Sequence, residues 1–236
     1  MSSDWPCNVE GLLAKGIGVV WVDDHLVVLD KPANMLSVPG KGPEGADCLS
    51  ARVQAVWTDA LVVHRLDMAT SGLIVMARGT AMQRALSMAF AQRQTRKRYE
   101  AIVAGHLSDA STPTSTGEAD AEGWHTIDLP LIVDWPNRPR SKVCHTTGKP
   151  SVTRWRVLGT DMPARHTRLA LEPVTGRSHQ LRVHLMALGH PILGDNLYAT
   201  DEALSAAPRL LLHATDLGLH HPVTGQFMHW HSAATF

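Results

Sequence analysis

The residues best suited to chemistry lie in the stretch His64-Arg65-Leu66-Asp67, which precedes a Thr-Ser-Gly turn and the apolar run at residues 73–77. An apolar run after a glycine turn is typical of a buried strand, so the polar residues before it belong to a loop at the edge of the core. In such a loop an ionised Asp67 can act as a nucleophile or as a general base. By spacing alone, a structural ion pair with an arginine is the more ordinary interpretation of Asp67.

A second group of polar residues begins a helix that we expect over residues 178–188. The sequence TGRSHQLRVH contains Arg177, His179, Gln180 and Arg182, and the first turn of a helix, with cations beside it, favours an anion. One alternative is a solvated helix face. Because Leu181 and other apolar residues alternate with the polar ones, however, some of these side chains must point inward. An inward arginine requires a carboxylate partner.

The surrounding segments must position these two groups. A strand, an Asp-Asp turn and a second strand are expected over residues 19–32, because β-branched residues dominate both runs. Helical spacing predicts helices over 47–57 and 80–94, with Thr80 as the N-cap of the second. The remaining segments are expected to be strands at 97–105, 151–159 and 166–174 and a C-terminal hairpin with a Thr-Gly turn. Strands in adjacent groups with helices inserted predict an α+β fold with a mixed, largely antiparallel sheet.

Composition limits the class of protein. The chain has 236 residues, of which 44% are hydrophobic and 19% charged, so we expect one domain or one elongated domain of two lobes. The polar, acidic segment at 108–123 has no periodicity and predicts an exposed, flexible insertion that is dispensable for chemistry. Neither a membrane span nor a secretory signal is evident, which favours a cytoplasmic protein. The three cysteines form no Cys-x-x-Cys pair, which argues against a disulfide framework or a thiolate zinc site.

Charge and histidine content leave two kinds of partner to consider. The formal net charge is zero, yet basic residues cluster at 93–99, 137–142 and 175–182, and such local clusters can bind phosphates. The 14 histidines include His229 and His231, which would share one face of a strand and suggest a metal-dependent hydrolase. That interpretation is weak because no carboxylate or cysteine accompanies the pair at ligand spacing.

Several long motifs resemble the RluA family of pseudouridine synthases. They are HRLDMATSGLIVMAR at 64–78, DKPANMLSVPG at 30–40, KRYEAIV around Tyr99, and TGRSHQLRVHLMALGHPILGDNLY at 175–198. The resemblance spans nearly the whole chain and implies a pseudouridine synthase catalytic domain over 18–236, after an N-terminal extension at 1–17 that lacks the S4-type RNA-binding domain of many relatives. Asn34 stands where the family usually has glycine, and asparagine tolerates a left-handed backbone.

The resemblance implies a role for each site residue. Asp67 supplies the ionised carboxylate, as nucleophile or base, and Arg182 is the cation expected beside it. Tyr99 packs against the flipped uracil, and Arg65 fills the space that the uridine leaves. Neither cofactor nor metal is needed. The expected RNA contacts are His64, Arg93, Arg96, Lys97, Arg98, Arg138, Arg140, Arg177, His179 and Gln180.

The segments at 129–151 and 207–214 resemble members of the family that act on both large-subunit ribosomal RNA and certain tRNAs. The implied activity is isomerisation of uridines in 23S rRNA and in the anticodon stem-loop of tRNAs, by a monomer. Two alternatives stay open, which are a family member that acts on only one of these RNAs and an RNA-binding module without catalysis. The second gives no reason for Asp67, Tyr99 and Arg182 to occur together.

Overall fold

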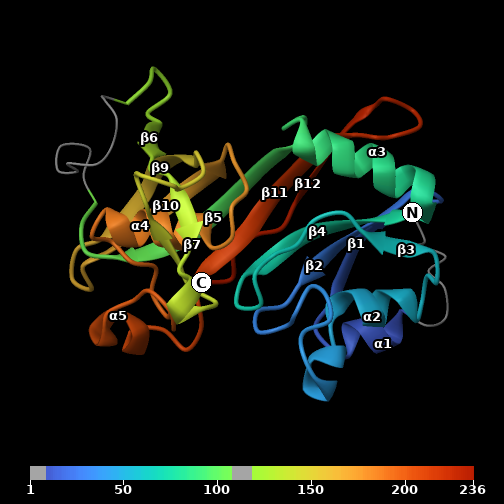
Figure 1. Ribbon diagram of the computed structural model, residues 1–236, viewed down its shortest axis with the longest axis horizontal. Coiled ribbons are helices and arrows are strands. Elements are labelled where there is room, and N and C mark those ends of the chain that lie inside the picture. Colours follow the sequence, from blue (N-terminus) through green and yellow to red (C-terminus); the bar gives the residue numbers. More distant parts are fainter. Residues whose placement is uncertain (1–8, 108–118) are drawn as a thin grey trace. The chain divides into compact units, whose positions relative to one another are not determined.

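The computed structural model describes residues 9–107 and 119–236, which divide into two compact units (Figure 1). Unit 1 contains the chain up to Arg96 together with residues 214–235. Unit 2 contains residues 97–213 and the terminal Phe236. Asp67 therefore belongs to unit 1, whereas Tyr99 and Arg182 belong to unit 2.

Unit 1 is a sheet covered by short helices. Its elements are α1 (Glu10–Leu13), β1 (Gly18–Val22), β2 (Leu26–Lys31), the 3-10 helix η1 (Pro43–Ala46), α2 (Leu49–Gln54), β3 (Ala60–Val62), β4 (Ser71–Arg78), α3 (Gly79–Ala91), β12 (Phe227–His231) and most of β11 (Leu212–His220). The strand order is β1-β2-β4-β11, with β3 also paired to β4 and β12 to β11. The pairs β1/β2, β2/β4, β3/β4 and β11/β12 are antiparallel.

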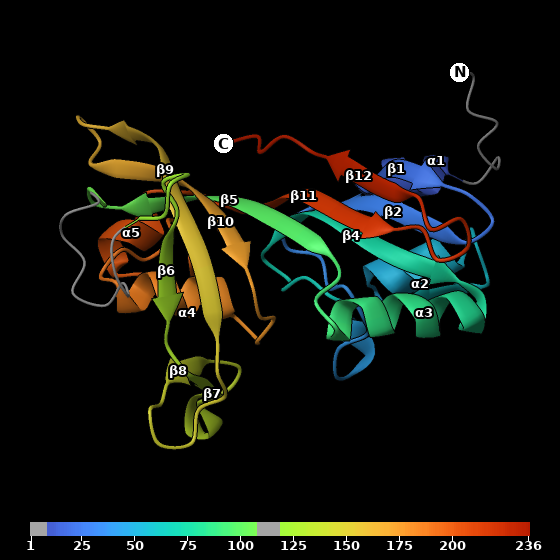
Figure 2. The same cartoon turned by 90° about the horizontal axis from the view of Figure 1, so that it is seen from above.

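One face of this sheet forms a hydrophobic core against α3. Alternate residues of a strand point to the same face, and the buried cluster contains Leu73 and Val75 of β4, Leu217 of β11 and Trp230 of β12. From α3 it takes Leu86. Figure 2 shows α2 and α3 along this same side of the strands. β4 is the strand that follows the Asp67 segment. It is held by neighbouring strands on both edges and by the hydrophobic core on one face.

Unit 2 contains a second antiparallel group of strands. Its elements are β5 (Arg96–Ala104), β6 (His125–Asp128), β7 (Leu131–Val133), η2 (Trp135–Asn137), β8 (Ser141–Val143), β9 (Val152–Asp161), β10 (His166–Pro173), α4 (Gln180–Ala187) and α5 (Asp201–Ser205). The strand order is β5-β10-β9-β6, and β7 and β8 form a separate two-stranded sheet. Each of these neighbouring pairs is antiparallel.

The expected α+β fold with a mixed, largely antiparallel sheet is confirmed. The Asp-Asp turn forms as predicted, because the Asp23 carboxylate accepts the backbone N–H groups of His25 and Leu26. The predicted left-handed conformation of Asn34 is also confirmed, with φ of 61°.

One local prediction is wrong. Thr80 is not the N-cap of α3, which begins at Gly79 with no side-chain cap. Gly79 has φ of 78° and donates its N–H to the Asp59 carbonyl, so a left-handed glycine turns β4 directly into the helix. Part of the expected N-terminal extension is structured as α1, which buries Leu12. The expected insertion lies outside the described residues at 108–118, but its end forms a turn in which Asp120 accepts the Trp124 N–H.

Candidate functional site

The segment at residues 64–70, named here the Asp67 loop, is anchored by its one deeply buried apolar residue. Leu66 is buried, and the Ser37 hydroxyl both donates to the Leu66 carbonyl at 2.7 Å and accepts its N–H at 3.1 Å. Arg65 on one side of this anchor is exposed, and Asp67 on the other is half-buried. The alternation leaves the guanidinium in solvent and the carboxylate at the edge of the core, as the sequence predicted for a polar loop before a buried strand.

Lys31 holds the Asp67 loop through hydrogen bonds to backbone carbonyls. Its side chain is fully buried, and Nζ donates to the carbonyls of Pro32 (2.8 Å), Met35 (2.8 Å) and Met68 (3.1 Å). Burial lowers the pKa of the Lys31 ammonium to about 8, although the nearby charge of Asp67 opposes that shift. Lys31 and Ser37 were not among the predicted site residues, although both lie in the DKPANMLSVPG motif.

Two further contacts hold the ends of the loop. His64 Nε2 accepts the Val75 N–H at 3.0 Å, and its ring stacks on Phe90 of α3 with the centroids 4.4 Å apart. Gly72 has φ of 109°, and a Cβ there would lie 2.4 Å from the Ala214 carbonyl oxygen. The glycine of the Thr-Ser-Gly turn thus allows β4 and β11 to approach closely. His64 is engaged within the protein, which favours a positioning role over direct contact with RNA.

The second group is built around Arg182 in α4. Some polar side chains of this segment were expected to point inward, and Arg182 is one that does; its carboxylate partner in unit 2 is Asp195. The guanidinium donates from Nε to one carboxylate oxygen at 2.8 Å and from Nη2 to the other at 2.6 Å. Asp195 also accepts the N–H groups of Leu197 and Tyr198. The GDNLY end of the longest motif therefore folds around the arginine, and the pairing of Arg182 with Asp67 stays a prediction.

Tyr198 connects this ion pair to neighbouring segments. Its hydroxyl accepts the Ser141 N–H at 2.8 Å and is hydrogen-bonded to His179 Nδ1 at 2.7 Å. The guanidinium of Arg182 lies 5.1 Å from the centre of its ring, and that of Arg140 lies 5.6 Å from it. Asp195 and Tyr198 were not among the predicted site residues, although both lie in the motif at 175–198.

Gln180 is buried, with both ends of its amide engaged. The oxygen accepts from the Thr175 hydroxyl and the Arg177 N–H, and the nitrogen donates to the Val152 carbonyl and the Thr153 hydroxyl. This arrangement joins the start of α4 to β9. It favours a positioning role for Gln180 over the expected contact with RNA.

The remaining predicted site residues differ in how exposed they are. Tyr99 is half-buried on β5, opposite Leu171 of β10. Arg98 is paired with Glu172 at 2.7 Å and lies 5.2 Å from the centre of the Trp124 ring. Burial lowers the pKa of Lys97. Among the predicted site residues, the exposed arginines are Arg65, Arg93, Arg96, Arg138, Arg140 and Arg177.

The predicted pairing of His229 and His231 on one strand face is confirmed, and the structure adds a carboxylate to it. Asp216 of β11 accepts from His229 Nε2 and His231 Nδ1, each at 3.1 Å. Sequence spacing could not find this carboxylate because it comes from the neighbouring strand. Even so, within residues 9–107 and 119–236 no group of three or more His, Cys, Asp or Glu residues has the arrangement to hold a metal ion.

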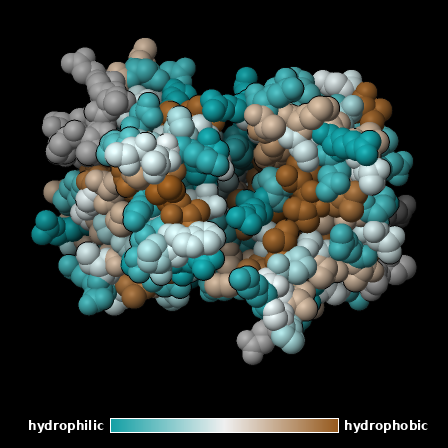
Figure 3. Space-filling view, viewed as in Figure 1, coloured by the Kyte–Doolittle hydropathy of each residue, from teal (hydrophilic) through white to brown (hydrophobic). Residues whose placement is uncertain are grey.

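The surface of unit 1 seen in Figure 3 gathers hydrophobic residues over the strands beside α3, with hydrophilic residues around them. Met68 of the Asp67 loop is 47% exposed. In the part of the chain that the structure describes, no helix is long and apolar enough to cross a membrane.

Comparison with known proteins identifies the family. The family model described as RNA pseudouridylate synthase matches residues 25–187. A protein of Escherichia coli strain K12 named "Dual-specificity RNA pseudouridine synthase RluA" is 49% identical over 219 residues, covering 92% of this chain and 93% of that protein. Proteins of the same name from Yersinia pestis and Pasteurella multocida are 49% and 44% identical, covering 92% and 93% of this chain and 99% and 94% of their own lengths.

Solved structures agree with this assignment. Human RNA Pseudouridylate Synthase Domain Containing 1 superimposes with a TM-score of 0.71 at 25% identity, covering 92% of this chain and 83% of that one. Human RNA Pseudouridylate Synthase Domain Containing 4 has the same fold, with a TM-score of 0.70 at 22% identity, and covers 96% of this chain and 92% of its own. By its sequence motifs, its fold and its relatives, the chain belongs to the RNA pseudouridylate synthase family and is an RNA pseudouridine synthase.

Proposed function

We propose that this pseudouridine synthase acts on two RNAs, 23S rRNA and the anticodon stem-loop of tRNAs. The observation that carries the proposal is the 49% identity, over 92% of the chain, to a protein named as a dual-specificity enzyme. The protein works without cofactor or metal, as a monomer in the cytoplasm. The reaction breaks the bond between N1 and C1′ of a uridine, turns the base, and joins C5 to C1′, while a proton leaves C5 and another is bound at N1.

Asp67 is the catalytic carboxylate in this proposal. The Asp67 loop supports that role because Leu66 is fixed by Ser37 and the Met68 carbonyl is fixed by Lys31, so the backbone on both sides of Asp67 is held. A rigid loop lets the carboxylate approach the sugar without a further ordering cost. The buried ammonium of Lys31 attracts the charged carboxylate, and both candidate roles, nucleophile and general base, require that charge.

Arg182 and Tyr99 act from unit 2. The two hydrogen bonds to Asp195 orient the Arg182 guanidinium, and a guanidinium has five N–H donors, so its geometry can serve more than one carboxylate. We assign that second carboxylate to Asp67. Tyr99, half-buried on β5, offers a ring for the flipped uracil and a hydroxyl for proton transfer.

Arg65 is the residue that occupies the vacated stack. Its exposure at the tip of a fixed loop supports this role, since a guanidinium plane can replace a base between its neighbours. The exposed Arg93, Arg96, Arg138, Arg140 and Arg177 bind phosphates. Recognition depends on the shape of the RNA loop and on its unstacked bases, because side chains cannot enter the deep groove of A-form RNA.

The experiment that tests the two-RNA proposal is pseudouridine mapping in total rRNA and tRNA from cells with and without the gene. We expect the deletion to remove modification from one site in 23S rRNA and one in tRNA anticodon stem-loops, and the purified protein to restore both in vitro. Loss in only one RNA class would replace the proposal by its single-substrate alternative.

The role of Asp67 is tested by Asp67→Asn. The amide keeps the shape of the side chain but is neither a strong nucleophile nor a base, so turnover should fall by at least a thousandfold while RNA affinity changes less than about threefold. Asp59→Asn, which alters a surface ion pair with Arg78 in the same unit, is the matched control and should keep full activity. Turnover within tenfold of wild type for Asp67→Asn would remove Asp67 from the mechanism.

A further inference from the structure

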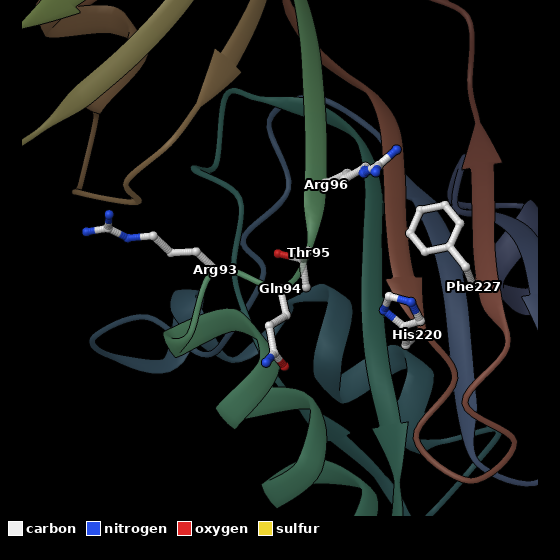
Figure 4. A pocket seen from close by; sticks show the side chains of 6 residues that line it. All are labelled: Arg93, Gln94, Thr95, Arg96, His220 and Phe227. Atoms are coloured by element: carbon white, nitrogen blue, oxygen red, sulfur yellow. The ribbon is translucent and has the colours of Figure 1, made fainter.

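Unit 1 contains a pocket that the catalytic assignments do not use (Figure 4). Its volume is about 570 Å³, within the range of pockets that hold small molecules. The lining side chains come from the segment between α3 and β5 and from the facing ends of β11 and β12, and they are Arg93, Gln94, Thr95, Arg96, His220 and Phe227. They include two guanidinium groups, an imidazole and an aromatic ring but no carboxylate.

The aromatic ring of the pocket is both exposed and fixed. Phe227 is 40% exposed, so its ring can be reached from solution. It lies opposite His220 in the β11/β12 register, with the ring centres 5.2 Å apart and tilted edge to face. A Cβ at Gly218 would lie 2.7 Å from its Cζ, so the glycine leaves space for the ring to rest against β11.

Arg96 completes the aromatic wall. Its guanidinium carbon lies 5.2 Å from the centre of the Phe227 ring. Figure 4 shows the side chains of Arg96, His220 and Phe227 converging, whereas Arg93 extends away from them. Among the described residues, neither Arg93 nor Arg96 forms a salt bridge with a carboxylate. Both cations are therefore available to an anion from solution.

Arg93 occupies a backbone position that favours glycine. It follows the end of α3 with φ of 59°, while its N–H bonds the Phe90 carbonyl and the Gln94 N–H bonds the Ala89 carbonyl. This pattern of hydrogen bonds is the Schellman motif, in which the left-handed residue is usually glycine. An arginine there carries a conformational cost. Phe90, one turn earlier, stacks on His64 of the Asp67 loop, so Arg93 lies at the end of α3 that faces that loop.

We propose that this pocket binds one nucleotide of the substrate RNA other than the uridine that is isomerised. Its base stacks on Phe227, and its phosphates are bound by Arg96, with Arg93 holding the backbone on the side of the Asp67 loop. The inference rests on the proposed action on RNA. Stacking on an aromatic ring combined with cations is how proteins hold unpaired nucleotides, and a pocket for a simple anion would not require the exposed ring.

The test measures the dissociation constant of a substrate stem-loop, with its flanking nucleotides, for Phe227→Leu, Phe227→Trp and Arg96→Gln. Phe227→Leu should weaken binding about tenfold, within the range for loss of one stacked base, whereas Phe227→Trp should restore wild-type affinity. Arg96→Gln should weaken binding and reduce the slope of log affinity against log salt by about one, whereas Phe227→Leu should leave that slope unchanged. Matched controls are Val223→Ala in the exposed β11/β12 turn and Lys15→Gln near Asp47, both outside the pocket.

A second arm identifies the nucleotide. Abasic substitutions are introduced one at a time along the RNA, and one position should weaken wild-type binding about as much as Phe227→Leu does. Combined with Phe227→Leu, that abasic site should cause no further loss, because one interaction cannot be removed twice.

The outcomes separate this inference from the function on which it rests. If wild-type protein forms pseudouridine but both Phe227→Leu and Arg96→Gln bind RNA normally, the pocket does not bind RNA and the inference is wrong. If the wild-type protein modifies neither RNA, the proposed function fails instead. Loss of affinity for Arg96→Gln alone, with Phe227→Leu unaffected, would reduce the site to a phosphate contact and overturn the stacking assignment.

Discussion

The Lys31 ammonium donates a hydrogen bond of 3.1 Å to the carbonyl oxygen of Met68, the residue that follows Asp67. Lys31 ends β2 and lies opposite Gly72 of β4, so one buried side chain links a strand end to the Asp67 loop. The relationship makes Lys31 a positioning residue whose removal should disturb both the fold and the carboxylate.

We expect Lys31→Met to lower the free energy of unfolding by about 2 kcal/mol, because three carbonyl groups lose their donor while the hydrocarbon chain is kept. Turnover should fall more than RNA affinity. Denaturant unfolding and single-turnover rates measure the two effects, with the exposed Lys15→Met as the control. Equal free energies of unfolding for Lys31→Met and Lys15→Met would show that the three hydrogen bonds of Lys31 do not stabilise the fold.

A comparison of wild type with Lys31→Met also gives a pH prediction. The pKa of Lys31 is about 8 in the folded protein and 10.5 when the side chain is solvated. Between these values the unfolded chain binds the proton and the folded chain does not, so the stability of wild type relative to Lys31→Met should rise with pH across that window. Unfolding titrations of both proteins at several pH values measure this difference. A difference that stays constant or falls would refute the assignment.

The buried Arg182–Asp195 pair should respond strongly to loss of one partner. Asp195→Asn removes the carboxylate charge that the buried Arg182 guanidinium pairs with, and should destabilise the protein by about 3–5 kcal/mol. Lys142→Gln, which removes an exposed pair with Asp134 in the same unit, should change stability by less than about 1 kcal/mol. Thermal unfolding measures the stability of both variants. Comparable losses of stability would mean that burial does not strengthen the dependence on the partner.

Arg65→Ala tests base flipping. At saturation, the variant should react far more slowly than wild type on a folded stem-loop but only slightly more slowly on an RNA whose target uridine is already unstacked, since unstacking costs a few kcal/mol only in the folded RNA. Arg65→Lys, which keeps the charge but not the plane, should behave like Arg65→Ala. Equal losses on both substrates would mean that Arg65 acts on the chemistry.

Cys144 should alkylate at unusually low pH. Hydrogen bonds to the Thr146 and Thr147 hydroxyls, together with their backbone N–H groups, lower the pKa of the Cys144 thiol to about 6. In a Cys7→Ser background, mass spectrometry should find iodoacetamide on Cys144 with a half-maximal rate near pH 6, whereas the buried Cys48 stays unmodified. Thr146→Val should move that midpoint upward, and a rate that still climbs toward pH 9 in the parent protein would contradict the prediction.

Local sequence determined the elements and the chemical character of the site. The run after Gly72 is a buried strand, and Asp67 lies on the loop before it, because periodicity and glycine turns act over a few neighbouring residues. Some polar side chains of α4 were predicted to point inward because apolar residues alternate with them, and Gln180 and Arg182 are buried. The motifs then specified the family, since their residues must occur together for the reaction.

The tertiary structure alone decided which distant residues meet. Asp195 pairs with Arg182 because the chain returns to α4 after thirteen residues, and Asp216 meets His229 because β11 and β12 pair in one register. The Phe227 pocket likewise needs a glycine on one strand and an arginine on another. The contacts between strands depend on register, and a one-residue shift would turn the side chains of the shifted strand to the opposite face. The Arg182–Asp195 pair depends instead on how the segment after α4 packs against it. Local propensity carries no information about register across that distance, so the supporting residues of the site came only from the folded chain.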